Sequence, residues 1–523
     1  MFYDSSAVMS RRDIAFGDNT NLLFWVGGMA FVLASAILFL LCTRYGIGIL
    51  PDSTRYMNID DRPFDAPLYP WLLMATTATG LSVAYAAKLI GFVILCANTV
   101  LIWHILVRTT GKYAYAAVGT ALIIFAPPFV SLHAMAMSEP LFIFAILVTV
   151  LVMMRFWETE SQTWLFACGI AVGLATLVRF TAPPLGAAIA LCIILNPRHR
   201  FVERFMDAIR LAVVSGAVFI LWAFISEAVA GRSIGRELKF YGTMDATTWM
   251  ASLKAYTTLL LPSQLPLAVT VGVLCLVLLG GAWLSVWHGR RVFALARETR
   301  VVEAMLPVAL GLFFLSYTGF LLLSTAIEAN LLLNGRYTFP VYVTSVIMMT
   351  ILLAHASAAR GPVRGLHWML VGLAALILAS HMVRTVDRTH DDYREGIGFV
   401  SRTWASSPTM QAVDRLPADA LIYSNGVDVM GYLTKRSAHY IPYRIQWRTG
   451  LDDPRNPYLK QVESLRLKLA QENAFVVFFD DVDWRFYLAS EAELKRLLNL
   501  KLINSERDGR IYAASPTVAE GTD

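Results

Sequence analysis

The stretch LLFWVGGMAFVLASAILFLLCTR, residues 22–44, decides the fold, and LPDSTRY, residues 50–56, follows it closely. The first stretch exceeds the roughly 20 apolar residues with which a helix crosses the hydrocarbon core of a bilayer. It is also longer than the roughly 7–15-residue apolar core of a signal peptide, and no small-residue cleavage site followed by a soluble chain comes after it. We therefore expect a first membrane span that is retained in the mature protein.

Apolar runs of this kind recur along most of the chain, and eleven of them are long enough to be predicted as spans. They occupy residues 22–44, 84–107, 113–130, 139–156, 163–178, 181–195, 208–230, 265–287, 305–327, 338–357 and 366–384. The apolar stretch from Pro67 to Thr79 is shorter and contains two prolines near its start, so we interpret it as a half-helix at the membrane interface. The sequence predicts a polytopic α-helical membrane protein with about 11 transmembrane helices.

The charged residues are distributed unevenly. Of the 523 residues, 57% are hydrophobic and 16% are charged, against about 25% charged in soluble domains, which excludes an ordinary soluble enzyme. Residues 385–523 hold 38 of the 82 charges (44 Lys and Arg plus 38 Asp and Glu). We predict a transmembrane domain over residues 1–384 and a small α/β domain over residues 385–523. Its predicted elements are strands at 421–424, 438–442 and 475–480, helices at 460–472 and 491–498, and a mainly parallel or mixed sheet.

The basic residues between the spans predict the orientation of the chain, because cytoplasmic loops are enriched in Lys and Arg. On one side of the predicted topology lie Arg108, Lys112, Arg198, Arg200, Arg204, Arg210, Arg290, Arg291, Arg297, Arg300, Arg360 and Arg364. The N-terminus is then cytoplasmic, while the loop at residues 45–83 and the C-terminal domain are extracytoplasmic. The net charge is +6, but the basic residues do not form a continuous patch along the sequence. Nucleic acid is therefore not an expected partner.

Two acidic residues lie at the predicted outer ends of spans. A carboxylate at a partly dry interface, such as that of Asp52, can have its pKa raised towards neutrality, as a general base needs. A helix cap or a solvated loop acid is the alternative, and Asp60, Asp61 and Asp65 share the same loop. Glu139 opens the fourth span, where a purely structural role is equally plausible because Ser138 can cap the helix and Pro140 fits its first turn.

Two arginines lie at the same predicted level, each with almost no loop around it. Arg179 and Arg336 must extend to the interface or bind an anion, and phosphate matches the bidentate geometry of a guanidinium. Lys88 is a third cation, for which extension to the interface is the preferred interpretation. His133 stands alone, and a hydrogen-bonded structural histidine is the favoured interpretation.

Two acids and two arginines on one outer face form a chemical pattern. The acids suit deprotonation of a hydroxyl, and the arginines suit an anionic leaving group. In glycosyl transfer from a lipid-linked sugar phosphate, the leaving phosphate needs positive charge nearby and no general acid. One base aligned opposite the leaving group then suffices for inversion.

At these residues the sequence resembles the GT-C superfamily of membrane glycosyltransferases, in the bacterial branch similar to protein mannosyltransferases, ArnT-like aminoarabinose transferases of lipid A and RgtA/B/C/D-like proteins. The matching segments are residues 51–53 with Tyr56, 67–70, 138–142, 178–182 and 336–337 with Pro340. Residues 416–425 and 431–434 look like the opening of the exported domain of this branch. The resemblance covers most of the chain.

The resemblance implies roles for the candidate residues. Asp52 would be the general base and Glu139 a second acid that binds substrate or assists the base. Some GT-C relatives bridge such acids with a divalent metal ion and others do not, so the sequence leaves a metal at Asp52 and Glu139 open and no cofactor certain. All five cysteines lie within apolar runs, which argues against a disulfide framework or a zinc site.

The remaining candidates concern the substrates. The donor would be a polyprenyl-phosphate sugar with its tail among the membrane lipids, and its phosphate would be bound by Arg179, Arg336, Tyr337 and Lys88. Residues assigned to the acceptor or the interfacial loop are Tyr56, Tyr69 and His133. The acceptor would be a hydroxyl of lipid A or lipopolysaccharide core, of another envelope glycan or of a protein, at the outer face of the bacterial inner membrane.

Two other functions remain open from the sequence. A non-enzymatic transporter or lipid flippase would tend to show internal repeats and polar residues near mid-span, whereas we find no repeat and the acids and arginines lie at one face. A scaffold that recruits partners through the C-terminal domain is a weaker alternative.

Overall fold

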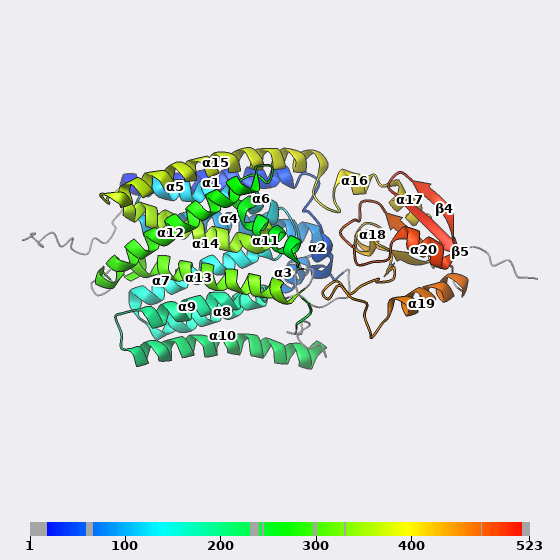
Figure 1. The fold of residues 1–523 in the computed structure, drawn as a ribbon, viewed down its shortest axis with the longest axis horizontal. Helices are drawn as coiled ribbons and strands as arrows, with labels where there is room; N and C mark the ends of the chain where they lie inside the picture. The colour runs from blue at the N-terminus through cyan, green and yellow to red at the C-terminus, as the bar shows by residue number, and fades with distance from the viewer. Residues whose placement is uncertain are drawn as a thin grey trace, which may run out of the picture.

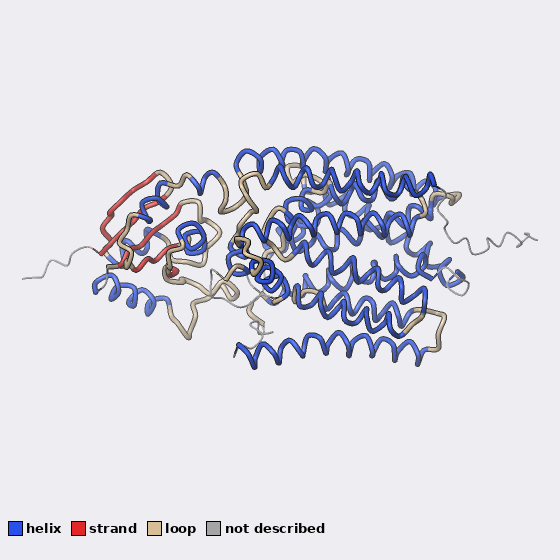
Figure 2. Tube along the Cα trace, turned by 180° about the vertical axis from the view of Figure 1, so that it is seen from behind, coloured by secondary structure: helices blue, strands red, loops and turns tan. Residues whose placement is uncertain are grey.

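A computed structural model describes residues 18–58, 66–230, 240–242, 245–295, 301–328, 331–471 and 473–514. The described chain forms two parts, a helical bundle and a C-terminal domain that contains all of its named strands (Figure 1, Figure 2). We call the end of the bundle nearest that domain its domain-facing end.

The bundle contains the predicted spans. Eight of the described helices are long and apolar enough to cross a membrane. They are α1 (Asp18–Cys42), α4 (Val83–Thr110), α7 (Glu139–Thr159), α10 (Phe201–Ala230), α12 (Leu267–Leu295), α13 (Val301–Ile327), α14 (Gly335–Ala356) and α15 (Pro362–Glu395). The prediction of a polytopic helical membrane protein is therefore confirmed, and the chain is an integral membrane protein.

The three other predicted spans are bent or short. Helices α5 (Tyr113–Ile124) and α6 (Pro127–His133) meet at 59° and could form one broken span. The break, at Phe125 and Ala126, directly precedes Pro127 and Pro128, which lack the N–H that a continuous helix would use. Helices α8 (Gln162–Val178) and α9 (Pro183–Leu195) are apolar but shorter, with 17 and 13 residues.

Other helices lie outside the predicted spans. Helix α2 (Pro51–Tyr56) and helix α3 (Leu68–Thr77) lie at the domain-facing end (Figure 1). The ten residues of α3 are too few to cross a bilayer, in agreement with the predicted half-helix. Helix α11 (Ala246–Leu260) was not predicted, and α15 continues beyond the predicted end of its span at residue 384.

The C-terminal domain is a mixed α/β structure. Its helices are α16 (Arg402–Ala405), α17 (Pro408–Asp414), α18 (Val427–Thr434), α19 (Tyr458–Gln471) and α20 (Glu491–Leu498). Its strands are β1 (Leu421–Ser424), β2 (His439–Tyr440), β3 (Ala474–Phe479), β4 (Leu500–Glu506) and β5 (Gly509–Ala514), in the order β2-β1-β3-β5-β4. The first three strands of that order are parallel, and β5 is antiparallel to both neighbours, so the predicted mixed sheet is confirmed.

The two parts meet around the residues that precede α2. The carbonyl oxygen of Ile49 accepts a hydrogen bond from the amide of Phe399 at 2.8 Å, and Gly48 pairs with the backbone of Ala134 and Ala136 on its other side. Gly398 has a positive φ of 59°, and a Cβ there would collide with the Ile49 carbonyl oxygen. The backbone leading into α2 is therefore held between the bundle and the C-terminal domain (Figure 1).

Candidate active site

Helix α2 places Asp52 at the domain-facing end of the bundle. Pro51 starts the helix, where its fixed φ suits the first position. The amide of Leu50 donates to Ser53 Oγ at 3.0 Å, which satisfies a backbone donor just before the helix. Met57 and Asn58, which has a positive φ of 57°, follow the helix, so Asp52 sits in a short helix with defined ends.

Arg336 connects the two predicted acids. Its Nη2 lies 2.5 Å from Asp52 Oδ2, and its Nε lies 2.9 Å from Glu139 Oε1. Asn334 accepts a hydrogen bond from the Arg336 amide at 3.0 Å and so caps α14. Residues far apart in the sequence, on α2, α7 and α14, are thereby joined through one guanidinium.

Arg179 extends this network on the Glu139 side. Its Nη1 lies 3.1 Å from Glu139 Oε1 and donates to Ser138 Oγ at 2.9 Å. The Glu139 side chain is only 1% exposed, and its Oε2 has no hydrogen-bond partner among the described residues. A buried acceptor without a partner calls for a ligand or a water molecule. We call Asp52, Glu139, Arg179 and Arg336 the charged network.

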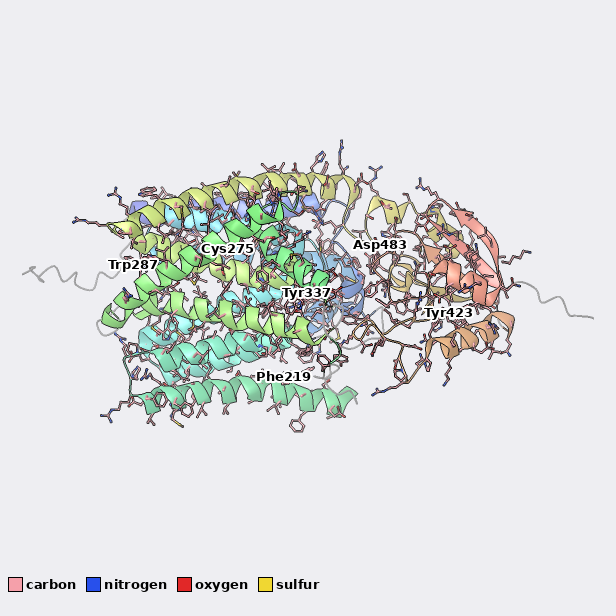
Figure 3. All side chains as sticks on the ribbon, in the orientation of Figure 1. Phe219, Cys275, Trp287, Tyr337, Tyr423 and Asp483 are labelled. Atoms are coloured by element: carbon pink, nitrogen blue, oxygen red, sulfur yellow. The ribbon has the colours of Figure 1, made fainter. Side chains whose placement is uncertain are left out.

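Three tyrosines predicted for substrate binding adjoin the charged network. The Tyr56 hydroxyl lies 3.1 Å from Ser138 Oγ, and the ring of Tyr69 packs edge-on against Tyr56 with centroids 5.2 Å apart. The Arg179 guanidinium lies 5.9 Å from the ring centroid of Tyr337. Figure 3 shows Tyr337 in the half of the bundle nearer the C-terminal domain, away from Trp287 at the other end. The structure therefore gathers these tyrosines around the two arginines.

Two predicted site residues make their contacts elsewhere. The Lys88 ammonium donates to the carbonyl oxygen of Thr43, just after the end of α1, at 2.9 Å. His133 is fully buried, with Nδ1 2.6 Å from the Phe129 carbonyl oxygen and Nε2 3.0 Å from Asn98 Nδ2. These contacts suit a helix-end cap and a structural histidine, and they do not join either residue to the charged network.

Two residues for which the sequence predicts no site contact bind members of the charged network. Arg55 Nη2 lies 2.8 Å from Asp52 Oδ1, and the spacing of three residues on one helix is the signal that could have predicted this pair. Ser138 was expected to cap α7, but its side chain makes no cap hydrogen bond. Its hydroxyl instead links Arg179 to Tyr56.

The pKa of Asp52 is shifted in the direction opposite to the one expected from the sequence. Burial disfavours the charged carboxylate, as expected, but the guanidiniums of Arg336 and Arg55 outweigh burial and hold the pKa of Asp52 well below its usual range. The expected rise towards neutrality is therefore wrong for the chain without substrate. The other acids of this loop, Asp60, Asp61 and Asp65, lie outside the described residues.

The charges around the network are unequal. Three guanidiniums, of Arg55, Arg179 and Arg336, face the two carboxylates of Asp52 and Glu139. If all five groups are ionised, the charged network together with Arg55 carries one excess positive charge, which we call the excess positive charge of the network. Such a cluster can bind a monoanion, and its guanidiniums suit the oxygen atoms of a phosphate group.

The two acids are arranged poorly for a divalent metal ion. Arg336 occupies the position between Asp52 and Glu139 and binds an oxygen of each. Within the described part of the chain, no group of three or more His, Cys, Asp or Glu residues lies close enough to hold a metal.

Comparisons with known proteins give the fold. Residues 61–225 match the family of dolichyl-phosphate-mannose-protein mannosyltransferases, while no curated protein matches the sequence significantly. The crystal structure of ArnT from Cupriavidus metallidurans bound to undecaprenyl phosphate is similar, with a TM-score of 0.56, 13% identity and coverage of 95% of this chain and 99% of that chain. Its apo state gives a TM-score of 0.54 at 13% identity, over 95% and 100% of the two chains.

A third structure is similar over the same part of this chain. The arabinofuranosyltransferase AftD from Mycobacteria gives a TM-score of 0.50 at 12% identity, covering 93% of this chain and 41% of that chain. At these identities the similarity establishes the arrangement of helices and the C-terminal domain.

Proposed function

Because the chain has the GT-C glycosyltransferase fold, we propose that it transfers a sugar from a polyprenyl-phosphate sugar to an acceptor hydroxyl, with inversion, at the outer face of the membrane. The observation that supports this most directly is the bridge from Asp52 through Arg336 to Glu139. In this bridge, the carboxylate that we propose as the base contacts the guanidinium that we propose to bind the donor phosphate. A transporter or flippase is not favoured, because nothing in transport requires this pairing of base and cation.

The donor phosphate is assigned to Arg336 and Arg179, with Tyr337 beside them. A sugar linked to a polyprenyl phosphate is a phosphodiester with one negative charge, which equals the excess positive charge of the network. When the bond between the sugar and the phosphate breaks, the phosphate oxygen takes the electron pair and gains negative charge. The two guanidiniums stabilise that charge as it develops, so no general acid is needed.

The general base is assigned to Asp52. A donor phosphate that binds Arg336 competes with the Asp52 carboxylate for the same guanidinium. Once Arg336 turns to the phosphate, Asp52 loses the nearer of its stabilising charges and its pKa rises. It can then accept the proton of the acceptor hydroxyl while the hydroxyl oxygen attacks the anomeric carbon from the side opposite the phosphate.

The proposed function is tested by supplying the purified full-length protein with a panel of polyprenyl-phosphate sugars. We expect one sugar type to be consumed and polyprenyl phosphate to be released, measured by mass spectrometry of the extracted lipids. The anomeric configuration of the product, determined by NMR, should be opposite to that of the donor. If no donor is consumed even with total envelope glycolipids and peptides present as acceptors, the proposed function is wrong.

The pH dependence should distinguish the free enzyme from the donor complex. In the free enzyme the depressed pKa keeps Asp52 ionised, so kcat/KM for the donor should stay constant as the pH falls to about 5 and decline only below the ordinary Asp pKa of about 3.9. In the donor complex Arg336 is engaged by phosphate, so kcat should decline at a higher pH. Both profiles are measured from pH 4 to 8. If kcat and kcat/KM decline at the same acidic pH, donor binding does not free Asp52 from Arg336, and this part of the proposal is contradicted.

A further inference from the structure

A cavity adjoins the charged network at Arg336 and is not lined by the other groups assigned to the donor. Its volume is about 680 Å³, within the roughly 300–1,000 Å³ typical of ligand pockets. It lies between α6, the residues that end and follow α11, the start of α14 and the domain-facing part of α15. Leu50 and Arg336 both line it, so it approaches Asp52 from the side of α6 and α15.

The donor groups lie on another side of Arg336. Of the residues that the structure describes, the lining of this cavity includes Arg336 but not Glu139, Arg179 or Tyr337. An inverting displacement needs the acceptor and the leaving group on opposite sides of the anomeric carbon. A cavity that is lined by Arg336 but not by the other donor groups is compatible with an acceptor that approaches from a different side.

The chemistry of the lining suits a sugar. The polar side chains of Ser131, Ser263 and Gln264 share this lining with the charged groups of α15 and with apolar side chains such as those of Leu132 and Met135. The polar groups can donate to and accept from the hydroxyls of a glycan. The cavity therefore offers a sugar both hydrogen-bonding groups and apolar contacts.

Arg384 is the unusual member of this lining. Its Nη1 donates to the carbonyl oxygen of Thr258 at 2.9 Å, and its Nε is buried with no hydrogen-bond partner. No carboxylate of the described residues forms an ion pair with it, whereas the next arginine of the helix, Arg388, pairs with Asp392 at 3.0 Å. A partly buried guanidinium without a counter-charge is costly unless a ligand supplies an anion.

We propose that this cavity is the acceptor subsite and that Arg384 binds an anionic group, a phosphate or a carboxylate, carried by the acceptor sugar near the accepting hydroxyl. This inference rests on the proposed function, because the term acceptor has meaning only if the chain is a glycosyltransferase. It narrows the acceptor to a charged glycan, whether or not a lipid is attached.

The test uses the purified full-length protein in a neutral detergent with three small probes, which are glucosamine 6-phosphate, glucuronic acid and glucose. Dissociation constants are obtained from the dependence of the thermal unfolding midpoint on probe concentration. We expect at least one anionic probe to bind at least tenfold more tightly than glucose. Which one binds identifies a phosphate or a carboxylate as the recognised group. Replacing Arg384 with Gln should weaken its binding by about 10- to 100-fold, as for a lost hydrogen bond to a charged group.

Two further variants make the result specific. Arg384→Lys keeps the charge and should lose less affinity, which keeps the test valid if Arg384→Gln folds poorly. Arg394→Gln removes an exposed arginine of the same helix that does not line the cavity, and it should bind the probes like the unaltered protein. Unchanged binding in Arg384→Gln, or equal binding of glucose, overturns the inference.

The donor reaction separates this inference from the proposed function. The KM for the donor, measured as acceptor-independent hydrolysis, should be the same in Arg384→Gln as in the unaltered protein. A raised donor KM would assign Arg384 to the donor site and overturn the inference while leaving the proposed function intact. Absence of donor consumption by the unaltered protein would instead contradict the proposed function, whatever the probes show.

Discussion

Asp52→Asn should lower kcat for sugar transfer by about 10²- to 10⁴-fold, the usual contribution of a general base, while the protein still folds. An asparagine can keep the hydrogen bond from Arg336 through its amide oxygen, but it cannot take a proton from the acceptor. The KM for the donor should stay the same or fall, because the carboxylate that competes with the donor phosphate for Arg336 at 2.5 Å has been removed. Steady-state kinetics with the identified donor measure both parameters.

Two matched variants define what this result means. Asp419→Asn removes an exposed carboxylate of the C-terminal domain and should leave kcat unchanged. Asp52→Glu keeps a carboxylate but displaces it by the length of one methylene group, so it should retain part of the activity. If Asp52→Asn transfers sugar at the normal rate, the base lies elsewhere and the assignment of Asp52 is wrong.

The membrane part of the fold was predictable because a spanning helix requires only that a segment be long enough and apolar enough. A run of about 20 apolar residues has few alternatives to a spanning helix, and each predicted run corresponds to a helix or to the bent pair of α5 and α6. Helix α11 was missed because Ala246–Leu260 is a mixture of polar and apolar residues outside any such run. Strands β4 and β5 were missed because neither LKLINSE nor GRIYAA alternates regularly between apolar and polar residues, and the two strands depend on pairing with each other.

The residues of the site were predictable from the sequence, but the contacts between their side chains were not. Each member of the charged network lies at the end of an apolar run, and alternate ends of spans reach the same side of a membrane. That argument brings Asp52, Glu139, Arg179 and Arg336 to one level but does not say which atoms meet. The bridge through Arg336 sets the direction of the Asp52 pKa, so the sequence-based expectation of a raised pKa failed at the step that needs a distance.

Arg336→Gln should have the second large effect, on donor binding and on stability together. The variant removes the excess positive charge of the network, so the KM for the donor should rise by at least tenfold. Loss of a preorganised cation at the leaving phosphate should lower kcat by about 10²- to 10³-fold, as removal of one stabilising donor does in other active sites. Arg336→Lys keeps the positive charge but lacks the forked guanidinium that binds both Asp52 and Glu139. It should therefore recover only part of the lost kcat and donor affinity.

Stability should fall as well, because Glu139 is 1% exposed and loses one of its two guanidinium partners. Removing one member of a buried ion pair costs about 3–5 kcal/mol, and here the loss should be smaller because Arg179 remains. Arg336→Lys keeps a cation beside Glu139 and should therefore recover more of the thermal unfolding midpoint than of sugar transfer. Arg402→Gln, at an exposed position in α16, is the control that should change neither property. If Arg336→Lys recovers sugar transfer as fully as stability, Arg336 serves only to neutralise the carboxylates beside it, and the donor phosphate must be bound by other groups.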